Sequence, residues 1–290
     1  MIQYIGKILL CALSLMVGTF VGGAFSTVLH LEQAKLPAPM NLPLLGVLCL
    51  DGGIVLSLAL AALSRSLPGN RGVRFAAIAW FAFAWLGINN TIEACLFTSL
   101  GGGPSMVVTM LFPCLFVAGA VVLLFRGREA GASFSSNVCQ FFANQTAAQW
   151  AIRLSAAVLA FPIVYFTFGM PVGLMVGDYY RHHEFGLRFP PLNVVIGVQL
   201  IRSLFALLGV LPILVAWPGS RRRFAWTFGL SLFVVSGLYG LIQAYWMPWT
   251  LRSIHVVELL FDSLAYGWLL ALLLLPRAPV EQAGVRNYNI

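Results

Sequence analysis

The sequence contains very little charge. Only 9% of its 290 residues are Asp, Glu, Lys or Arg, whereas 60% are hydrophobic. Soluble globular domains carry roughly 25% charged residues. A composition so poor in charge and so rich in apolar side chains excludes an ordinary soluble domain.

The sequence also lacks the motifs of several common chemistries. It contains no Walker phosphate loop, no glycine fingerprint for dinucleotides and no serine-nucleophile elbow. Neither ATP hydrolysis nor an α/β-hydrolase mechanism is therefore indicated. The five cysteines show no CxxC spacing, so neither a disulfide framework nor a thiolate zinc site is indicated.

What the sequence does contain is a series of long apolar runs. Each is about 20 residues or longer, which is enough for a helix to cross the hydrocarbon core of a bilayer. The runs predict eight transmembrane helices, over residues 5–29, 42–63, 74–100, 105–125, 150–177, 192–216, 224–247 and 254–275. The sequence therefore predicts an all-α, polytopic membrane protein embedded in a lipid bilayer.

The basic residues are distributed unevenly around these helices. If the N-terminus, every second loop and the C-terminus share one side, that side holds Lys7, Arg65, Arg71, Arg74, Arg126, Arg128, Arg153, Arg221, Arg222, Arg223, Arg277 and Arg286. The other side holds only Lys35, Arg181, Arg188 and Arg252. Because Lys and Arg gather on the cytoplasmic side, we predict a multi-pass protein of the inner (plasma) membrane with both termini cytoplasmic. The net charge of +8 then reflects topology and anionic lipid, and nucleic acid is not an expected partner.

The two halves of the sequence resemble each other. The clearest match pairs "PGNRGVRFAAIAW" (68–80) with "PGSRRRFAWTF" (218–228). The offset is 150 residues at Pro68, Gly69 and Arg71, and after a one-residue deletion it is 149, which pairs Arg74 with Arg223. Two further matches pair "GINNTIEACLF" (87–97) with "GLYGLIQAYWM" (237–247), and "PLLGVLCLD" (43–51) with "PLNVVIGVQ" (191–199). We interpret these matches as a tandem 4+4 repeat. The alternative is chance similarity between apolar segments.

This repeat divides the chain into four parts. They are a first four-helix membrane repeat (1–125), a cytoplasmic linker (126–149), a second four-helix membrane repeat (150–278) and a cytoplasmic tail (279–290). Each repeat has an even number of spans, so both insert in the same orientation. The repeats are then expected to be parallel, related by an axis along the membrane normal.

Ionisable side chains interrupt the last apolar run, in "SIHVVELLFDSLAYG" (253–267). At 100° per residue, His255, Glu258 and Asp262 fall within about 60° of one another on a helix, and Tyr266 joins the same face. A charge near the bilayer centre costs about 2.5–3.5 kcal/mol on insertion scales, so this face is expected to point toward other helices or water. The aligned positions of the first repeat carry no ionisable group, and this asymmetry favours a function over simple packing.

Other predicted spans carry polar residues at a similar depth. They are Asp51 in the second span, Asn89, Asn90 and Glu93 in the third, and Gln199 and Arg202 in the sixth. Together with the polar face of the last span, they predict a pocket open to the periplasmic side, with Arg202 as the counter-ion of the carboxylates. The alternative is structural: Arg202 and Asp51 form a buried pair, and the other polar groups only hold helices together.

Imidazole and carboxylate groups raise the hypothesis of a divalent metal, since both suit zinc, iron or manganese. The candidate ligands in the last span are His255, Glu258 and Asp262. A second set lies on the same side of the membrane: His30, Asp178, His182, His183 and Glu184. Haem held by His30 and His255 is a third hypothesis, and a solvated loop without any cofactor is the alternative to all of them.

Three functions fit these features. The first is binding or transport of a small solute or ion, which the repeat, the inward-facing ionisable groups and the glycine-interrupted second span (Asp51, Gly52, Gly53) support. The second is an intramembrane enzyme, metal-dependent in one version, that acts on a lipid or isoprenoid substrate. The third is a non-catalytic subunit or assembly factor that binds other membrane proteins, which the short loops favour.

Overall fold

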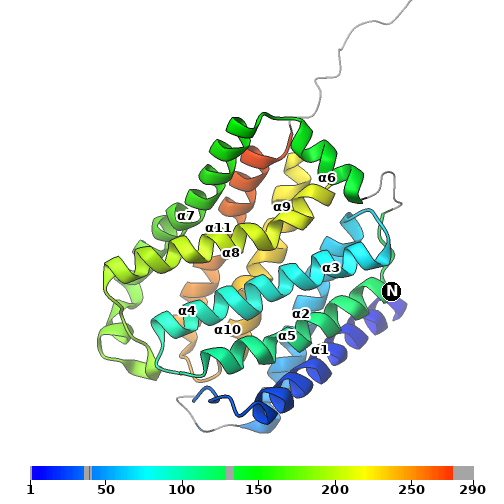
Figure 1. Cartoon of the computed structure of the whole chain (residues 1–290). Coiled ribbons are helices and arrows are strands. Elements are labelled where there is room, and N and C mark those ends of the chain that lie inside the picture. The colour runs from blue at the N-terminus through cyan, green and yellow to red at the C-terminus, as the bar shows by residue number, and fades with distance from the viewer. Residues whose placement is uncertain (1, 36–38, 40, 129–133, 277–290) are drawn as a thin grey trace, which may run out of the picture.

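Eight apolar helices, each long enough to cross a membrane, dominate the computed structural model, which describes residues 2–35, 39, 41–128 and 134–276 (Figure 1). Six of them are uninterrupted α-helices. They are α1 (Ile2–Val28), α2 (Leu42–Ser66), α5 (Gly103–Leu124), α7 (Ala147–Arg181), α8 (Leu192–Ala216) and α11 (Trp249–Leu274). The third and seventh spans are Arg71–Phe97 and Arg221–Gln243. The prediction of eight helices long and apolar enough to cross a membrane is confirmed, and the described residues contain helices without β-strands.

Short polar residues mark where several of these helices begin. The side chains of Asn41, Asn70 and Ser220 accept hydrogen bonds from backbone N–H groups in the first turns of α2, α3 (Arg71–Ala82) and α9 (Arg221–Phe233). Thr146 and Gln149 form a reciprocal capping box at the start of α7. Such caps satisfy N–H groups that have no partner within the helix, so these polar residues define the helix starts.

The third and seventh spans are irregular in a similar way. In the third, α3 (Arg71–Ala82) continues through the π-helix η1 (Phe83–Asn89) into α4 (Asn90–Phe97). In the seventh, α9 (Arg221–Phe233) continues through the π-helix η3 (Val234–Leu238) into α10 (Tyr239–Gln243). Single π-helical turns within α-helices are frequent at functional sites. The sequence predicts an interruption in the second span, at Gly52 and Gly53. The structure has none there, because α2 is continuous from Leu42 to Ser66.

Gly52 and Gly53 have a packing role. A Cβ at Gly52 would lie 3.2 Å from the ring of Tyr239, and one at Gly53 would lie 3.2 Å from Leu15. The two glycines therefore let α10 and α1 approach α2 closely, which explains why they do not loosen the helix.

The helices of each half pack mainly on one another, and one helix of each half, α2 or α8, also packs against the other half. Helix α1 packs on α5 and α7 packs on α11, and Figure 1 shows these two pairs along opposite sides of the bundle. Helix α2 packs against α9, η3 and α10, whereas α8 packs against α3 and η1. The π-helices η1 and η3 contact each other. The centre of the bundle is thus built from both halves of the chain.

The segment between α5 and α7 contains a further helix, α6 (Phe134–Ala143). Its Phe141 stacks on Trp150 at 4.9 Å between ring centroids, and the Trp150 Nε1–H donates to the Phe142 carbonyl at 2.9 Å. The sequence predicts residues 126–149 as a linker and gives no helix there; α6 has ten residues, which are too few to cross a membrane. The predicted tail 279–290, with Arg286, and also Arg277, lie outside the described residues.

Candidate functional site

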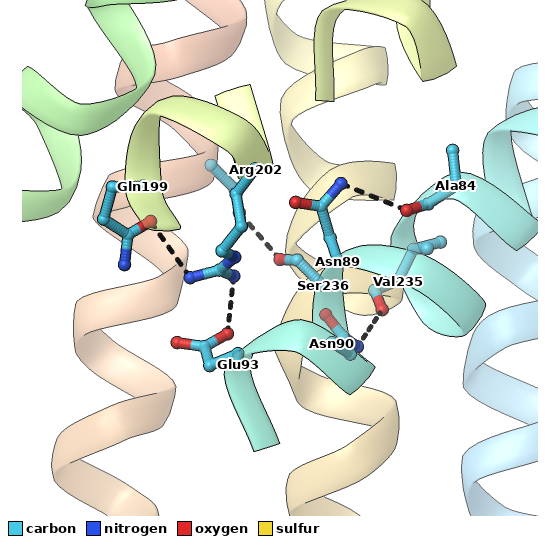
Figure 2. Close-up of polar contacts among 9 residues, drawn as sticks. Ala84, Asn89, Asn90, Glu93, Gln199, Arg202, Val235 and Ser236 are labelled. Carbon is cyan, nitrogen blue, oxygen red and sulfur yellow. Dashed lines mark hydrogen bonds and ion pairs between the residues drawn. The ribbon is translucent and has the colours of Figure 1, made fainter. Parts of the chain in front are cut away.

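A buried ion pair joins the third and sixth spans. Arg202 of α8 donates to the Glu93 carboxylate of α4 at 2.7 Å and to the Gln199 side-chain carbonyl at 3.1 Å (Figure 2). The Arg202 side chain is 4% exposed and the Glu93 side chain 33%. The partner of Arg202 is therefore Glu93, and the alternative pairing with Asp51 is wrong.

Aromatic rings of α7 complete the surroundings of Arg202. Its guanidinium lies 5.5 Å from the ring centroid of Phe161 and 5.9 Å from that of Tyr165. A cation over an aromatic face is stabilised electrostatically, more strongly when it is desolvated. Phe161 in turn packs edge-on against Tyr266 of α11 and obliquely against Trp85 of η1. The Arg202 guanidinium thus packs against a cluster of aromatic rings from the third, fifth and eighth spans.

The polar face of α11 meets α7 through a hydrogen-bonded array. His255 Nδ1 lies 2.7 Å from the Glu258 carboxylate, and its Nε2 lies 3.1 Å from the Tyr180 hydroxyl. A Cβ at Gly169 would lie 3.1 Å from the same carboxylate. Glycine at this position therefore makes room for Glu258 between α7 and α11.

Asp262 lies deeper than this array. It is 13 residues beyond the start of α11 at Trp249, which corresponds to about 20 Å along the helix. It lies within electrostatic reach of Glu258, Glu93 and Arg202. Its Oδ1 atom is buried and has no hydrogen-bond partner among the described residues. Buried carboxyl oxygens are normally hydrogen-bonded, so this oxygen points to a bound proton or ligand.

Unpaired polar atoms gather around the same cluster. In the described part of the chain, buried atoms without a hydrogen-bond partner include Asn89 Oδ1, Asn90 Oδ1, Gln199 Nε2, Arg202 Nε and the Tyr266 hydroxyl. The amide groups of Asn89 and Asn90 do donate, to the carbonyls of Ala84 and Val235 (Figure 2). Asn90 therefore ties the end of η1 to η3, while its oxygen is left free.

Of the ten residues predicted to line the pocket, nine lie in or beside this cluster. Glu93, Gln199 and Arg202 are bonded directly, His255 and Glu258 are bonded to each other, and Asp262 is within their electrostatic reach. Asn89, Asn90 and Tyr266 lie around them. Asp51 does not join the cluster, because its position on α2 is exposed.

The candidate metal ligands are not arranged as a metal site. Among the described residues, no three His, Cys, Asp or Glu side chains gather closely enough to hold a metal ion. The physical reason at His255 is plain, since both of its ring nitrogens are already engaged by Glu258 and Tyr180. In the last turn of α7, Asp178 pairs with Arg181, and in the following loop His183 Nδ1 lies 3.3 Å from the Leu187 carbonyl.

Backbone hydrogen bonds join the loop after α7 to the end of α4, which carries Glu93. Ser99 N donates to Gly186 O and Arg188 N donates to Phe97 O, both at 2.8 Å. The Arg188 side chain also donates to the carbonyls of Leu96 and Cys95. A loop of the second half is therefore bonded to the first half at this end of the bundle, beside Glu93.

Sequence reasoning missed the contribution of the fifth span. Phe161, Tyr165 and Tyr180 contact the cluster from α7, and Gly169 makes room for it. A signal was present: these residues recur at helical spacing, so they share one face of α7. Their aromatic character resembled that of ordinary membrane-facing residues, and only packing distinguishes the two.

Comparisons with known proteins add no assignment. The chain has no match among protein-family models, curated proteins or solved structures.

Proposed function

We propose that this chain is an integral membrane protein that binds and carries a small cation, of which the proton is the simplest, through the cluster around Arg202. Eight apolar helices support a multi-pass membrane protein. The carrier function rests on the surroundings of Asp262: its buried Oδ1 has no hydrogen-bond partner among the described residues, and its carboxyl interacts electrostatically with Glu93, Glu258 and the single permanent cation of the cluster, Arg202.

The charge balance of the cluster supports a cation as its occupant. Arg202 compensates Glu93 directly, and His255 can compensate Glu258 only when it carries a proton. Asp262 forms no ion pair with another described residue, and its Oδ1 has no hydrogen-bond partner there. Because an uncompensated charge in a low-dielectric interior is expensive, Asp262 takes up either a proton or a cation.

A route to Asp262 follows from the hydrogen-bonded array. Tyr180 lies one residue before the end of α7 at Arg181, and His255 bridges it to Glu258. Glu258 is one turn from Asp262 on α11, and the two carboxyls interact electrostatically. We infer that a proton or cation enters by Tyr180 and His255 and reaches Asp262 through Glu258.

We also propose the parallel 4+4 repeat, the cytoplasmic termini and the location in the inner membrane. Helices α2 and α8 each have 25 residues and begin 150 residues apart, at Leu42 and Leu192. The third and seventh spans also begin 150 residues apart, at Arg71 and Arg221. Under this topology, Tyr180 and Glu93 lie toward the periplasmic side, where the predicted pocket opens.

Flux measurements in proteoliposomes test this function. With the wild-type protein and a membrane potential, an enclosed pH dye should report proton movement, and sodium or potassium substitution should identify another cation. Asp262→Asn and Glu93→Gln should abolish the flux. Asp51→Asn is the matched control, because Asp51 is an exposed carboxylate of the same membrane region, and its flux should equal the wild type. Equal flux of every tested cation in Asp262→Asn and wild type would remove the cluster from transport.

The Tyr180–His255–Glu258 array supports a second candidate, an intramembrane enzyme acting on a lipid or isoprenoid substrate. A histidine held by a carboxylate and facing a hydroxyl is suited to general acid–base catalysis. Incubation with membrane lipid extract, followed by mass spectrometry, should then show a product that His255→Gln does not form. An unchanged lipid profile with the wild-type protein would rule out this candidate for the lipids present.

A further inference from the structure

We propose that the groove between α2 and α9 binds an anionic phospholipid, with an acyl chain in the groove and the phosphate at its basic end. This site is separate from the charged cluster and does not depend on the proposed carrier function. It rests on the shape of the groove, on the charges at one end and on a difference from the matching place in the other half.

The groove is an apolar cavity between two helices of different halves. Its volume is about 360 Å³, and its walls are formed by Val55, Leu58, Ala59, Ala62, Trp226, Thr227, Leu230, Ser231 and Val234. The side chains of Leu58, Trp226 and Leu230 are each more than 40% exposed. A hydrogen bond from the Ser231 hydroxyl to the Ala59 carbonyl, at 3.1 Å, closes its floor. An apolar channel open along its length suits a hydrocarbon chain.

Arginines lie at one end of this groove. Arg65 is one turn beyond Ala62 on α2, and Arg222 and Arg223 are one turn before Trp226 and Thr227 on α9. All three arginines are exposed. Basic pockets between membrane helices bind the head groups of anionic lipids, and arginine suits phosphate because its donors form a planar fork.

No acidic residue of the described chain competes for these arginines. The described carboxylates all lie in other parts of the bundle, at Glu32, Asp51, Glu93, Asp178, Glu184, Glu258 and Asp262. Asp51, the only one on α2, lies 14 residues before Arg65, or about 21 Å along the helix. The basic end of the groove therefore favours an anion.

The matching place in the other half, between α8 and α3, is built differently. There Trp80 lies against α8 and its Nε1–H donates to the Leu208 carbonyl at 2.9 Å. Trp80 and Leu208 are 150 residues from Leu230 and Leu58, which line the groove. At the 150-residue offset of the helix starts, the positions of Arg65, Arg222 and Arg223 are taken by Val215, Gly72 and Val73. Two of the features that define the lipid site, the exposed Leu230 wall and the three arginines, are thus replaced in the other half by a bonded tryptophan and by uncharged residues.

Native mass spectrometry of the purified protein tests this site. Phosphatidylglycerol and phosphatidylcholine with the same acyl chains are added in turn, and the bound fraction of each is measured. The wild type should retain one phosphatidylglycerol in preference. Arg222→Gln/Arg223→Gln should weaken this binding by about tenfold or more. Ala62→Trp, which fills the groove and keeps every charge, should weaken it as well.

The matched control is Arg126→Gln/Arg128→Gln, which removes the same charge from exposed positions just after α5. It should bind phosphatidylglycerol like the wild type. Equal weakening in the control, equal retention of phosphatidylcholine, or no loss in Ala62→Trp would each overturn the proposal. Glycerol phosphate without acyl chains should not compete, and competition would show that the arginines bind free phosphate and not a lipid.

Discussion

Two junctions between the halves of this molecule have similar backbones and different chemistry. At one, α8 packs against the third span, and Arg202 binds Glu93 and Gln199. At the other, α2 packs against the seventh span, and the Cys49 thiol donates weakly to the Gln243 side-chain carbonyl at 3.6 Å. Both junctions include a π-helix, η1 or η3. The backbone arrangement therefore does not require the charges.

Under the proposed repeat, the two junctions are compared at the offset of 150 residues given by the helix starts. Gln199, Arg202 and Glu93 correspond to Cys49, Gly52 and Gln243. Gly52 leaves space that is filled by Tyr239, whose ring would lie 3.2 Å from a Cβ there. One junction is thus charged and has unpaired polar atoms, and the other is neutral and filled. This difference favours a function for the charged junction, since packing alone is achieved without it.

Among these variants, Glu93→Gln should cause the largest loss of stability. It makes the charged junction resemble the neutral one but leaves the Arg202 guanidinium, 4% exposed, without its anion. Leaving a buried charge unpaired typically costs about 3–5 kcal/mol of stability. Thermal or denaturant unfolding in detergent should therefore show a large loss, and a stability within about 1 kcal/mol of the wild type would contradict the burial of this charge.

Arg202→Gln should cost less, about 1–3 kcal/mol, because the Glu93 side chain is 33% exposed and can be hydrated or protonated. The double variant Arg202→Gln/Glu93→Gln should be more stable than Glu93→Gln alone, since no charge is left unpaired. A double-mutant cycle measures this coupling. Strictly additive losses would mean that the two residues do not act as a pair.

Gln243→Glu tests the neutral junction from the opposite direction. The change removes the amide that donates to the Tyr239 carbonyl at 3.3 Å and adds a carboxylate beside Gly52, where the other junction has Arg202. We expect a loss of about 1–3 kcal/mol in unfolding experiments. The matched change Gln199→Glu beside Arg202 should be better tolerated, and equal losses would show that local charge does not distinguish the junctions.

Cys49→Ala should have the smallest effect. Its thiol makes one long contact with Gln243, and thiols are weak donors, so the loss should stay below about 1 kcal/mol. Gln199→Ala, at the corresponding position, removes an acceptor of the Arg202 guanidinium at 3.1 Å and should cost about 1.5–3 kcal/mol. Similar melting temperatures for Cys49→Ala and Gln199→Ala would contradict the difference between the neutral and the charged junction.

Comparison of the junctions also explains why Asp51 was misplaced. Alignment of residues 43–51 with 191–199 set Asp51 opposite Gln199, at an offset of 148. The helix starts, Leu42 and Leu192, give an offset of 150 and set Cys49 opposite Gln199. Two residues turn a helix by about 200°, so the same error turns Asp51 from the inside to the exposed face. Repeats of similar apolar residues do not fix register to this precision.

Sequence alone was sufficient for the eight helices and for the polar face of α11. Apolar length decides whether a helix can span a membrane, and His255, Glu258 and Asp262 share a face because helical spacing is local. Only the tertiary structure decided that Arg202 pairs with Glu93, that Tyr180 completes the array of His255, and that η1 and η3 meet at the centre. These contacts join spans far apart in the chain, and the packing of whole helices, which no local pattern encodes, sets the rotation of each span against its neighbours.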